Sequence, residues 1–399
     1  MSSIATSLTL IAISPAQVNR FTAPTDLAGG RNSGCATSIV RKSSASTPTN
    51  IGNYVVHPEG SLIYWDGKIV SCQLITSTHR SIGVHILSHC GNSVSQGDIT
   101  VFIEIKGHSQ AEYYIVDHES KSILWIDNQC PESFRDASCA KHDHEYWIHI
   151  ENFPGPFFPS PKDRHNLMNV LASSAVDAST SDGSTCPMSV EQIDKSLQML
   201  KSFSDDVDIN QTYAMARLWG MLLQSRVING YGTTQARLDR FISISDIPPR
   251  LMGVYETLNG FMFRTPRAHL DRCSRAWADR IAYTQEWRKF RSTNEKEWQQ
   301  VAMLASVLII ASLLVKIQST CITVLLPNAA LFTGLGSLAG AYYLLNESQN
   351  LGDHAADASV YFQQREEHLY GVQKIAVINA APQALLIWGF IFFIAAILL

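Results

Sequence analysis

The chain has 399 residues, which is enough for two or three domains of ordinary size. Charged residues make up only 17%, against about 25% in a typical soluble domain. Residues 317–346 and 375–399 carry no charge at all, which excludes a uniform soluble globule. The formal net charge of −4 excludes a strongly basic nucleic-acid-binding protein, so we expect no nucleic-acid partner.

The N-terminal part of the chain has the composition of an unfolded segment. Residues 15–50 are rich in Ser, Thr, Ala, Gly and Asn and contain few large apolar side chains. Such a stretch cannot bury enough apolar surface to offset the entropy lost on ordering. We therefore expect a disordered N-terminal segment over residues 1–50.

The region 51–155 is predicted to be rich in β-strands. The pair Asp66-Gly67 separates two apolar runs, Leu62–Trp65 and Ile69–Leu74, and this arrangement is typical of a β-hairpin. In Ile99–Ile105, isoleucine and valine occupy every second position. That period of two predicts a strand with one buried face.

The segment Tyr113–Trp125 resembles the second and third strands of a WW domain. It contains an aromatic pair, an aliphatic residue, an Asp-His pair, a short turn and a tryptophan in the order of that family. In WW domains the tyrosine and the last tryptophan clamp a proline ring of an extended, proline-rich ligand. The resemblance implies that Tyr114, Val116, His118 and Trp125 line such a groove.

The segment also departs from the WW pattern, which leaves two further interpretations open. The family's first tryptophan should fall near Phe102–Ile105, and its closing proline should stand where Asn128 stands. The strands can instead belong to a larger β-domain, with their aromatic residues packed in its core. The chain's own proline-rich segment 153–161 can also fill the groove, because its local concentration is high.

The order of elements resembles a group of fungal multi-pass membrane proteins with a degenerate WW-like segment. These proteins share a His-Pro-Glu-Gly segment, here residues 57–60, and the WW-like strand pair. They also share the aromatic element that here runs from Tyr146 to Pro154, and a helical region before C-terminal membrane spans. The resemblance implies an architecture and no particular activity.

Residues 156–297 are predicted to form a helical cytosolic and juxtamembrane region. Ser189 begins a helix, with Gln192 three residues later as its capping-box partner. A second helix is expected over Asp208–Ile228, where Asn229-Gly230 ends it.

Two further segments of this region have compositions that are compatible with a position at the membrane surface. Arg250–Phe263 is apolar with few charges, and either an interfacial helix or an ordinary buried helix fits this composition. Pro266–Gln300 is expected to be one long helix that continues into the first membrane span. Its arginines, lysines and tryptophans suit an anionic membrane surface.

Residues 298–399 are predicted to form a membrane domain. A bilayer core needs about 20 apolar residues per helix, and we place three spans at 299–319, 327–346 and 375–399. Apart from Lys316 near the end of the first, these spans contain no ionisable group of the kind that transport and proton relay usually need. The composition therefore favours an anchor.

Orientation and helix packing follow from two patterns in this domain. Basic residues precede the first span and lie in the 347–374 loop, whereas the turn between the first two spans has Lys316 alone. The positive-inside rule then places the N-terminal part in the cytosol. Gly336 and Gly340 form a small-xxx-small pair, which we interpret as close helix packing within this chain.

The sequence contains one better metal candidate and a second, weaker cluster at Cys72, His79, His85, His89 and Cys90. Cys130, Cys139, His142 and His144 are four possible zinc ligands, but their spacing matches none of the usual pairs. The acidic and histidine residues of the 347–374 loop are better explained as the solvated face of a helix. Phosphate-binding, dinucleotide-binding and nucleophile motifs do not occur, so no cofactor is expected.

The sequence thus predicts an α+β fold with a small antiparallel β module, then a helical region, then three C-terminal transmembrane helices. The favoured function is a membrane-anchored interaction or scaffold protein. Its expected partners are the lipid bilayer and proline-rich segments, either of other proteins or its own 153–161 segment. The alternatives are a membrane-bound metal-dependent enzyme that uses the Cys/His-rich β region, and a purely structural membrane protein.

Overall fold

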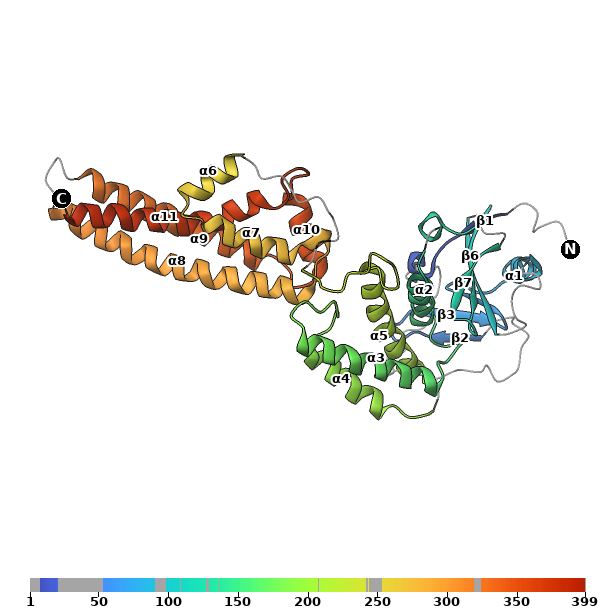
Figure 1. The fold of residues 1–399 in the computed structure, drawn as a ribbon. Coiled ribbons are helices and arrows are strands. Elements are labelled where there is room, and N and C mark those ends of the chain that lie inside the picture. Colours follow the sequence, from blue (N-terminus) through green and yellow to red (C-terminus); the bar gives the residue numbers. More distant parts are fainter. Residues whose placement is uncertain are drawn as a thin grey trace, which may run out of the picture. The chain divides into compact units, whose positions relative to one another are not determined.

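The computed structural model describes residues 8–20, 53–89, 98–107, 109–126, 129–135, 137–206, 208–241, 243, 253–318 and 324–398. These residues form eleven helices, α1 to α11, and a seven-stranded sheet (Figure 1). The chain divides into two compact units, Met1–Ala236 and Arg237–Leu399, which are described in turn.

The first unit is built on a mixed sheet. Its strands are β1 (Thr9–Ala12), β2 (Asn53–Val56), β3 (Leu62–Asp66), β4 (Ile69–Ser71), β5 (Ile99–Lys106), β6 (Gln110–Asp117) and β7 (Ser122–Leu124). Their order is β1-β6-β5-β4-β3-β2, with β7 also paired to β6. The hairpin predicted at Asp66-Gly67 is confirmed, because β3 and β4 pair antiparallel and Gly67 has a φ of 60°.

Both faces of this sheet are covered by helices. On one face, α1 (Ser77–His89) packs through Ile82 and Ile86; on the other, α2 (Cys139–Asn152) packs through Tyr146 and Ile150. Strand β5 was expected to have one exposed face. This prediction is wrong, because successive side chains of β5 are buried in two different cores, one on each face of the sheet. The 51–155 region is therefore less purely β than its sequence indicated.

Three helices complete the first unit: α3 (Pro161–Thr180), α4 (Val190–Ser202) and α5 (Ile209–Ile228). The predicted capping box of Ser189 and Gln192 is confirmed, and so is the helix that Asn229-Gly230 ends. Helix α5 packs on α2, where the Trp147 and Trp219 rings stack with centroids 5.5 Å apart.

Part of the predicted disordered segment is ordered. Strand β1 pairs in parallel with β6, and a 3-10 turn follows at Pro15–Gln17. The Ala16 backbone N–H donates to Glu145 of α2 at 3.0 Å, which anchors the turn. The composition of residues 1–50 could not predict this ordering, because the hydrogen-bond partner Glu145 lies far away in the sequence. The remaining residues up to 50 lie outside the described part of the chain.

The second unit consists of α6 (Gly253–Phe261), α7 (Thr265–Ala276), α8 (Thr284–Gln318), α9 (Leu325–Gln349), α10 (Ala355–Arg365) and α11 (Gln373–Leu398). Helix α9 packs against both α8 and α11 to form a three-helix bundle (Figure 1). The shorter helices α6, α7 and α10 lie around the end of the bundle where α11 begins.

The long continuous helix predicted over Pro266–Gln300 is wrong. The chain breaks between α7 and α8, where Asp279 and Arg280 have φ values of 51° and 62°. The buried Arg237 side chain forms an ion pair with Asp279 and stabilises this break. Local helix propensity does not reveal such a break, because the stabilising partner is distant in the sequence.

Candidate functional site

The outer surface of the three-helix bundle is strongly apolar. Its exposed large apolar side chains, which we call the apolar belt, are Met303, Leu304, Val307, Ile310, Leu313, Leu314 and Ile317 on α8, Leu325, Phe332 and Leu335 on α9, and Ile378, Phe390, Ile391, Ile394, Ile397 and Leu398 on α11. Soluble monomers rarely expose so extensive a contiguous apolar surface to water. The belt therefore marks a surface that faces a non-aqueous environment or a partner.

Two of the described helices are long and apolar enough to cross a membrane, and they run over Thr284–Ile317 and Gln373–Leu398. Only 22% of the apolar window of each is buried within the protein, unlike the core helix of a soluble domain. The sequence analysis expected three such helices, but α9 does not reach the same apolar composition. Asn328, Thr333 and Ser337 lower its hydropathy, together with three glycines.

The small residues of α9 and α11 allow the helices to approach closely. A Cβ atom at Gly336 would lie 3.3 Å from Leu385, and one at Gly340 would lie 3.3 Å from Pro382. The predicted packing role of the Gly336/Gly340 pair within this chain is therefore confirmed. Gly389 of α11 is tighter still, because a Cβ atom there would come within 2.6 Å of Leu308.

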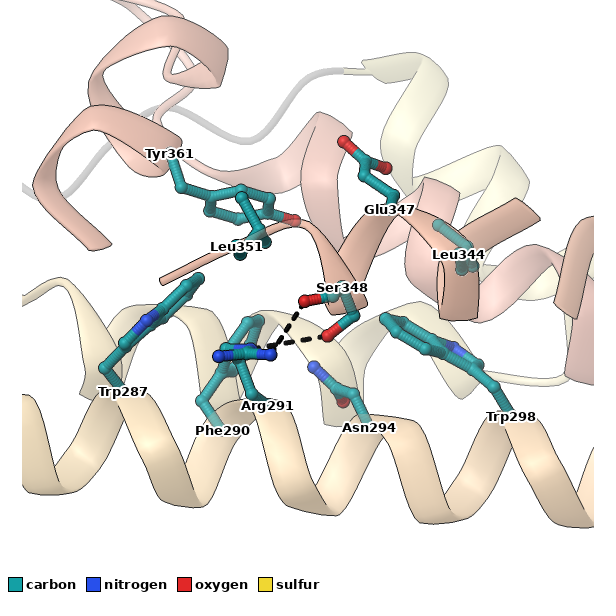
Figure 2. A pocket seen from close by; sticks show the side chains of 10 residues that line it. All are labelled: Trp287, Phe290, Arg291, Asn294, Trp298, Leu344, Glu347, Ser348, Leu351 and Tyr361. Carbon is teal, nitrogen blue, oxygen red and sulfur yellow. Dashed lines mark hydrogen bonds between the residues drawn. The ribbon is translucent and has the colours of Figure 1, made fainter. Parts of the chain in front are cut away.

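The end of the bundle at which α11 begins carries polar side chains, among them Arg291, Glu295 and Ser348, and we call it the polar end. Here α8, α9 and α10 enclose a cavity of about 20 Å³, which Figure 2 shows from close by. Arg291 crosses from α8 to α9, where its guanidinium donates to the Ser348 carbonyl at 2.7 Å and to the Ser348 hydroxyl at 3.4 Å. The Ser348 hydroxyl in turn donates to Glu295 at 2.5 Å.

A buried amide faces this small cavity. Asn294 is fully buried on α8, and its Nδ2 has no hydrogen-bond partner among the described residues. A cavity of about 20 Å³ accommodates one water molecule, which would satisfy such a donor. The arrangement is suited to fixing the helices in register.

A second polar cluster joins α7 to α8. Arg272 donates to Asn294 at 2.7 Å and makes two bonds of 2.9 Å to the carboxylate of Glu297. Burial, together with the neighbouring Arg272 charge, lowers the pKa of His269 to about 3. This histidine is therefore neutral at physiological pH.

The residues of the expected proline groove lie inside the first unit. Tyr114 and Val116 of β6 are fully buried, in the larger β-domain that the sequence analysis gave as an alternative. The Tyr114 ring stacks on Phe102 with centroids 4.8 Å apart, and its hydroxyl lies 3.0 Å from His149 Nδ1. Neither residue presents a surface to a ligand in this structure.

The other two groove residues contact the chain itself. The His118 ring stacks on Phe157 with centroids 4.1 Å apart, which places part of the proline-rich 153–161 segment over this histidine. The half-buried Trp125 donates from its indole nitrogen to the Ile13 carbonyl at 2.8 Å and packs against Phe134. Burial lowers the pKa of His118 to about 4, so its ring is neutral at physiological pH.

The four proposed zinc ligands do not converge. No group of three or more His, Cys, Asp or Glu side chains could hold a metal ion within the described residues. His142 lies on α2 beside the rings of Phe134 and Trp125, while Cys139 at the start of α2 is exposed. Cys130 is half-buried, and burial lowers the pKa of His144.

The polar end was not predicted from the sequence. Arg291 and Arg272 were counted only as membrane-surface charges, whereas both make interhelical hydrogen bonds. The sequence did contain a signal for this site. Asn294 lies four residues before Trp298, at a position where the helical pattern of buried residues calls for an apolar side chain. A polar residue on the inner stripe of a helix usually has a buried partner.

Comparison with known proteins gives no further guidance. No family model matches the chain, and neither the curated proteins nor the solved structures searched contain a significant match.

Proposed function

We propose that this chain is an integral membrane protein whose helical bundle anchors the α/β unit at a bilayer surface, where that unit acts as an interaction or scaffold module. The observation that carries the proposal is the apolar belt on all three helices of the bundle. Lipid is the environment in which such a surface costs no free energy.

The length of the bundle supports this assignment. On α11, the stretch from Ala380 to Leu398, in which Gln383 is the one polar residue, is about 28 Å long at about 1.5 Å per residue, close to the roughly 30 Å of a bilayer core. It begins directly after Asn379, whose carbonyl accepts a hydrogen bond from Trp298 of α8. The apolar parts of α8 and α11 therefore start at the same level.

Chain connectivity makes α9 a third crossing in this proposal, despite its lower hydropathy. Helix α8 runs from the polar end to the far end, and α11 begins again at the polar end, where Ile375 packs with Trp287. The intervening α9 must therefore return the chain across the same thickness. Its polar Ser337 faces inward and donates to the Pro382 carbonyl at 2.7 Å, away from lipid.

The charge distribution favours a cytosolic polar end. Basic residues gather on the helices there, at Arg264, Arg267, Arg275, Arg288, Lys289, Arg291, Lys296, Arg365 and Lys374. The far end offers Lys316 alone. The positive-inside rule then places the polar end, and the α/β unit that precedes it in the chain, on the cytosolic side.

A triple lysine variant tests the anchor. Met303, Val307 and Ile310 are 60–63% exposed on α8, so changing all three to lysine disturbs no packed core. In lipid each lysine costs about 2.5–3.5 kcal/mol at the helix centre, so the variant should appear in the alkaline carbonate supernatant while the wild-type chain stays in the membrane pellet.

The matched control places three lysines on exposed apolar positions of the first unit, Leu74, Val84 and Val176. It should sediment with membranes like the wild type. Extraction of the wild-type chain by carbonate, together with its partition into the aqueous phase of Triton X-114, would refute the anchor.

Orientation is tested with the exposed thiol of Cys139. A membrane-impermeant maleimide should label it in vesicles with the cytosolic face outward and not in vesicles of opposite orientation. The Cys139→Ser variant gives the background from the other thiols. Labelling only in the opposite vesicles would reverse the proposed topology.

A further inference from the structure

Helices α6 and α7 form a hairpin that lies along the start of α11. Met262, between the two helices, packs against Ala380 and Ala384 of α11. Farther along α11, the Trp388 ring lies between Phe261 and Phe263, with centroids 5.0 Å and 5.2 Å away. The Trp388 indole also donates to the Phe261 carbonyl at 3.2 Å. The turn of the hairpin is thus fixed against the apolar part of the bundle.

The turn directs large apolar side chains outward. Phe261 is 62% exposed and Phe263 is 40% exposed, and Val254 on the same helix is 61% exposed. Phe263 and Arg264 both adopt left-handed backbone conformations, with φ values of 56° and 61°. The usual residue at such a helix end is glycine, so two larger residues here carry a conformational cost.

The charges of the hairpin are unevenly distributed. Arg264 and Arg267 are exposed beside the turn, and neither forms an ion pair within the described residues. The acidic residues Glu256 and Asp271 lie toward the open end of the hairpin, where they and Arg267 all influence Tyr255. The turn therefore presents two aromatic rings together with two exposed arginines that form no salt bridge among the described residues.

The hairpin extends from the expected boundary between water and lipid into the apolar part of the bundle. Met262 contacts Ala380, which directly follows Asn379, whereas Phe261 and Phe263 contact Trp388, roughly 13 Å farther along α11. On α9, Tyr342 and Tyr343 are 72% and 64% exposed, next to the Leu344 that shares a cavity with Trp298. Exposed aromatic rings near this boundary are typical of a membrane interface.

We propose that the turn of the α6–α7 hairpin enters the lipid leaflet at the polar end, with Phe261 and Phe263 among the acyl chains and Arg264 and Arg267 bound to the phosphates of anionic lipids. This inference rests on the proposed membrane anchor. It adds a lipid-binding surface whose ligand is an acidic headgroup in the same leaflet. Guanidinium groups suit this ligand because they bind phosphate oxygens through two parallel hydrogen bonds.

The test measures backbone hydrogen exchange of the hairpin in the full chain reconstituted into nanodiscs. One set of discs contains phosphatidylcholine alone, and the other a two-to-one mixture of phosphatidylcholine and phosphatidylglycerol. We expect amides of residues 258–267 to exchange roughly tenfold more slowly in the anionic discs, because two bound arginines oppose local opening.

The double variant Arg264→Gln/Arg267→Gln should lose this dependence on lipid charge. Both side chains are exposed, so the fold is retained, and the melting temperature of the variant checks this. The matched control Lys162→Gln/Lys201→Gln removes the same charge from exposed positions of the first unit and should keep the dependence. Equal exchange of the wild type in both lipids, or an unchanged response in the arginine variant, would overturn the proposal.

Two further outcomes separate the alternatives. If millimolar inorganic phosphate in phosphatidylcholine discs slowed exchange to the same extent, the ligand would be the free ion and the lipid assignment would be wrong. If the chain failed to enter nanodiscs at all, the membrane anchor itself would fail, and this inference with it. Incorporation without any effect of lipid charge would overturn the hairpin proposal alone.

Discussion

The indole nitrogen of Trp298 donates a hydrogen bond of 3.1 Å to the main-chain carbonyl of Asn379. Both residues are buried, and the bond ties α8 to α11 at the level where the apolar part of each helix begins. Just before this level on α8, Arg291 and Asn294 face the polar end. The bond thus stands at the transition between the polar and apolar parts of the bundle.

Removing this donor should destabilise the bundle. In Trp298→Phe the Asn379 carbonyl stays buried without its indole partner and part of the ring volume is lost, so we expect the free energy of unfolding to fall by about 1–3 kcal/mol. Thermal unfolding in detergent measures the change. The control Tyr342→Phe removes a hydroxyl from an exposed ring and should change stability little. Equal stabilities of Trp298→Phe and wild type would contradict a structural role for the bond.

Gly389 should tolerate no larger side chain. In Gly389→Val the new Cβ atom would approach Leu308 of α8 to 2.6 Å and the Thr333 hydroxyl of α9 to 3.0 Å, so these packed side chains must shift. We expect a loss of about 1–3 kcal/mol and a lower melting temperature, as is usual for overpacking. Gly260→Val is the comparison, because nothing lies within 4 Å of its Cβ position. The prediction fails if the two variants melt at the same temperature.

The Tyr114 hydroxyl should contribute to stability because of its burial. Tyr114→Phe leaves His149 Nδ1 without this partner in the core, with an expected cost of about 1–2 kcal/mol in denaturant unfolding. Tyr213→Phe makes the same chemical change at the surface, where the hydroxyl donates to Glu59 at 2.7 Å, and should cost less than about 1 kcal/mol. A larger effect at Tyr213 than at Tyr114 would refute this ranking.

Acid should destabilise the first unit through its buried histidines. Burial lowers the pKa of His118 to about 4, against about 6.5 in an unfolded chain. Between these values the unfolded state binds more protons, so the free energy of unfolding falls as the pH drops below about 6.5. The slope from this histidine is at most about 1.4 kcal/mol per pH unit.

The His118→Gln variant isolates that contribution. Its unfolding free energy should depend less steeply on pH between 7 and 5 than that of the wild type, although His79 and His149, whose pKa values burial also lowers, still contribute. Denaturant titrations followed by circular dichroism give both slopes. Identical slopes would show that His118 titrates normally in the folded protein.

Several elements could be predicted because their signals are local. The Asp66-Gly67 turn, the capping box at Ser189 and the end of α5 at Asn229 depend only on backbone preferences of adjacent residues. The aromatic residues of β6 were recognisable as a strand for the same reason. Whether they face a ligand or a core was not recognisable, because α2 covers Tyr114 from a later part of the sequence.

The sequence by itself determined that the last hundred residues contain long apolar helices, since hydropathy depends on composition alone. Tertiary structure decided which side of each helix remains exposed, that Gly336 and Gly340 face α11, and that Arg272 and Asn294 meet at the polar end. The physical reason is that burial and hydrogen bonding are properties of pairs of residues, and here the partners come from separate helices.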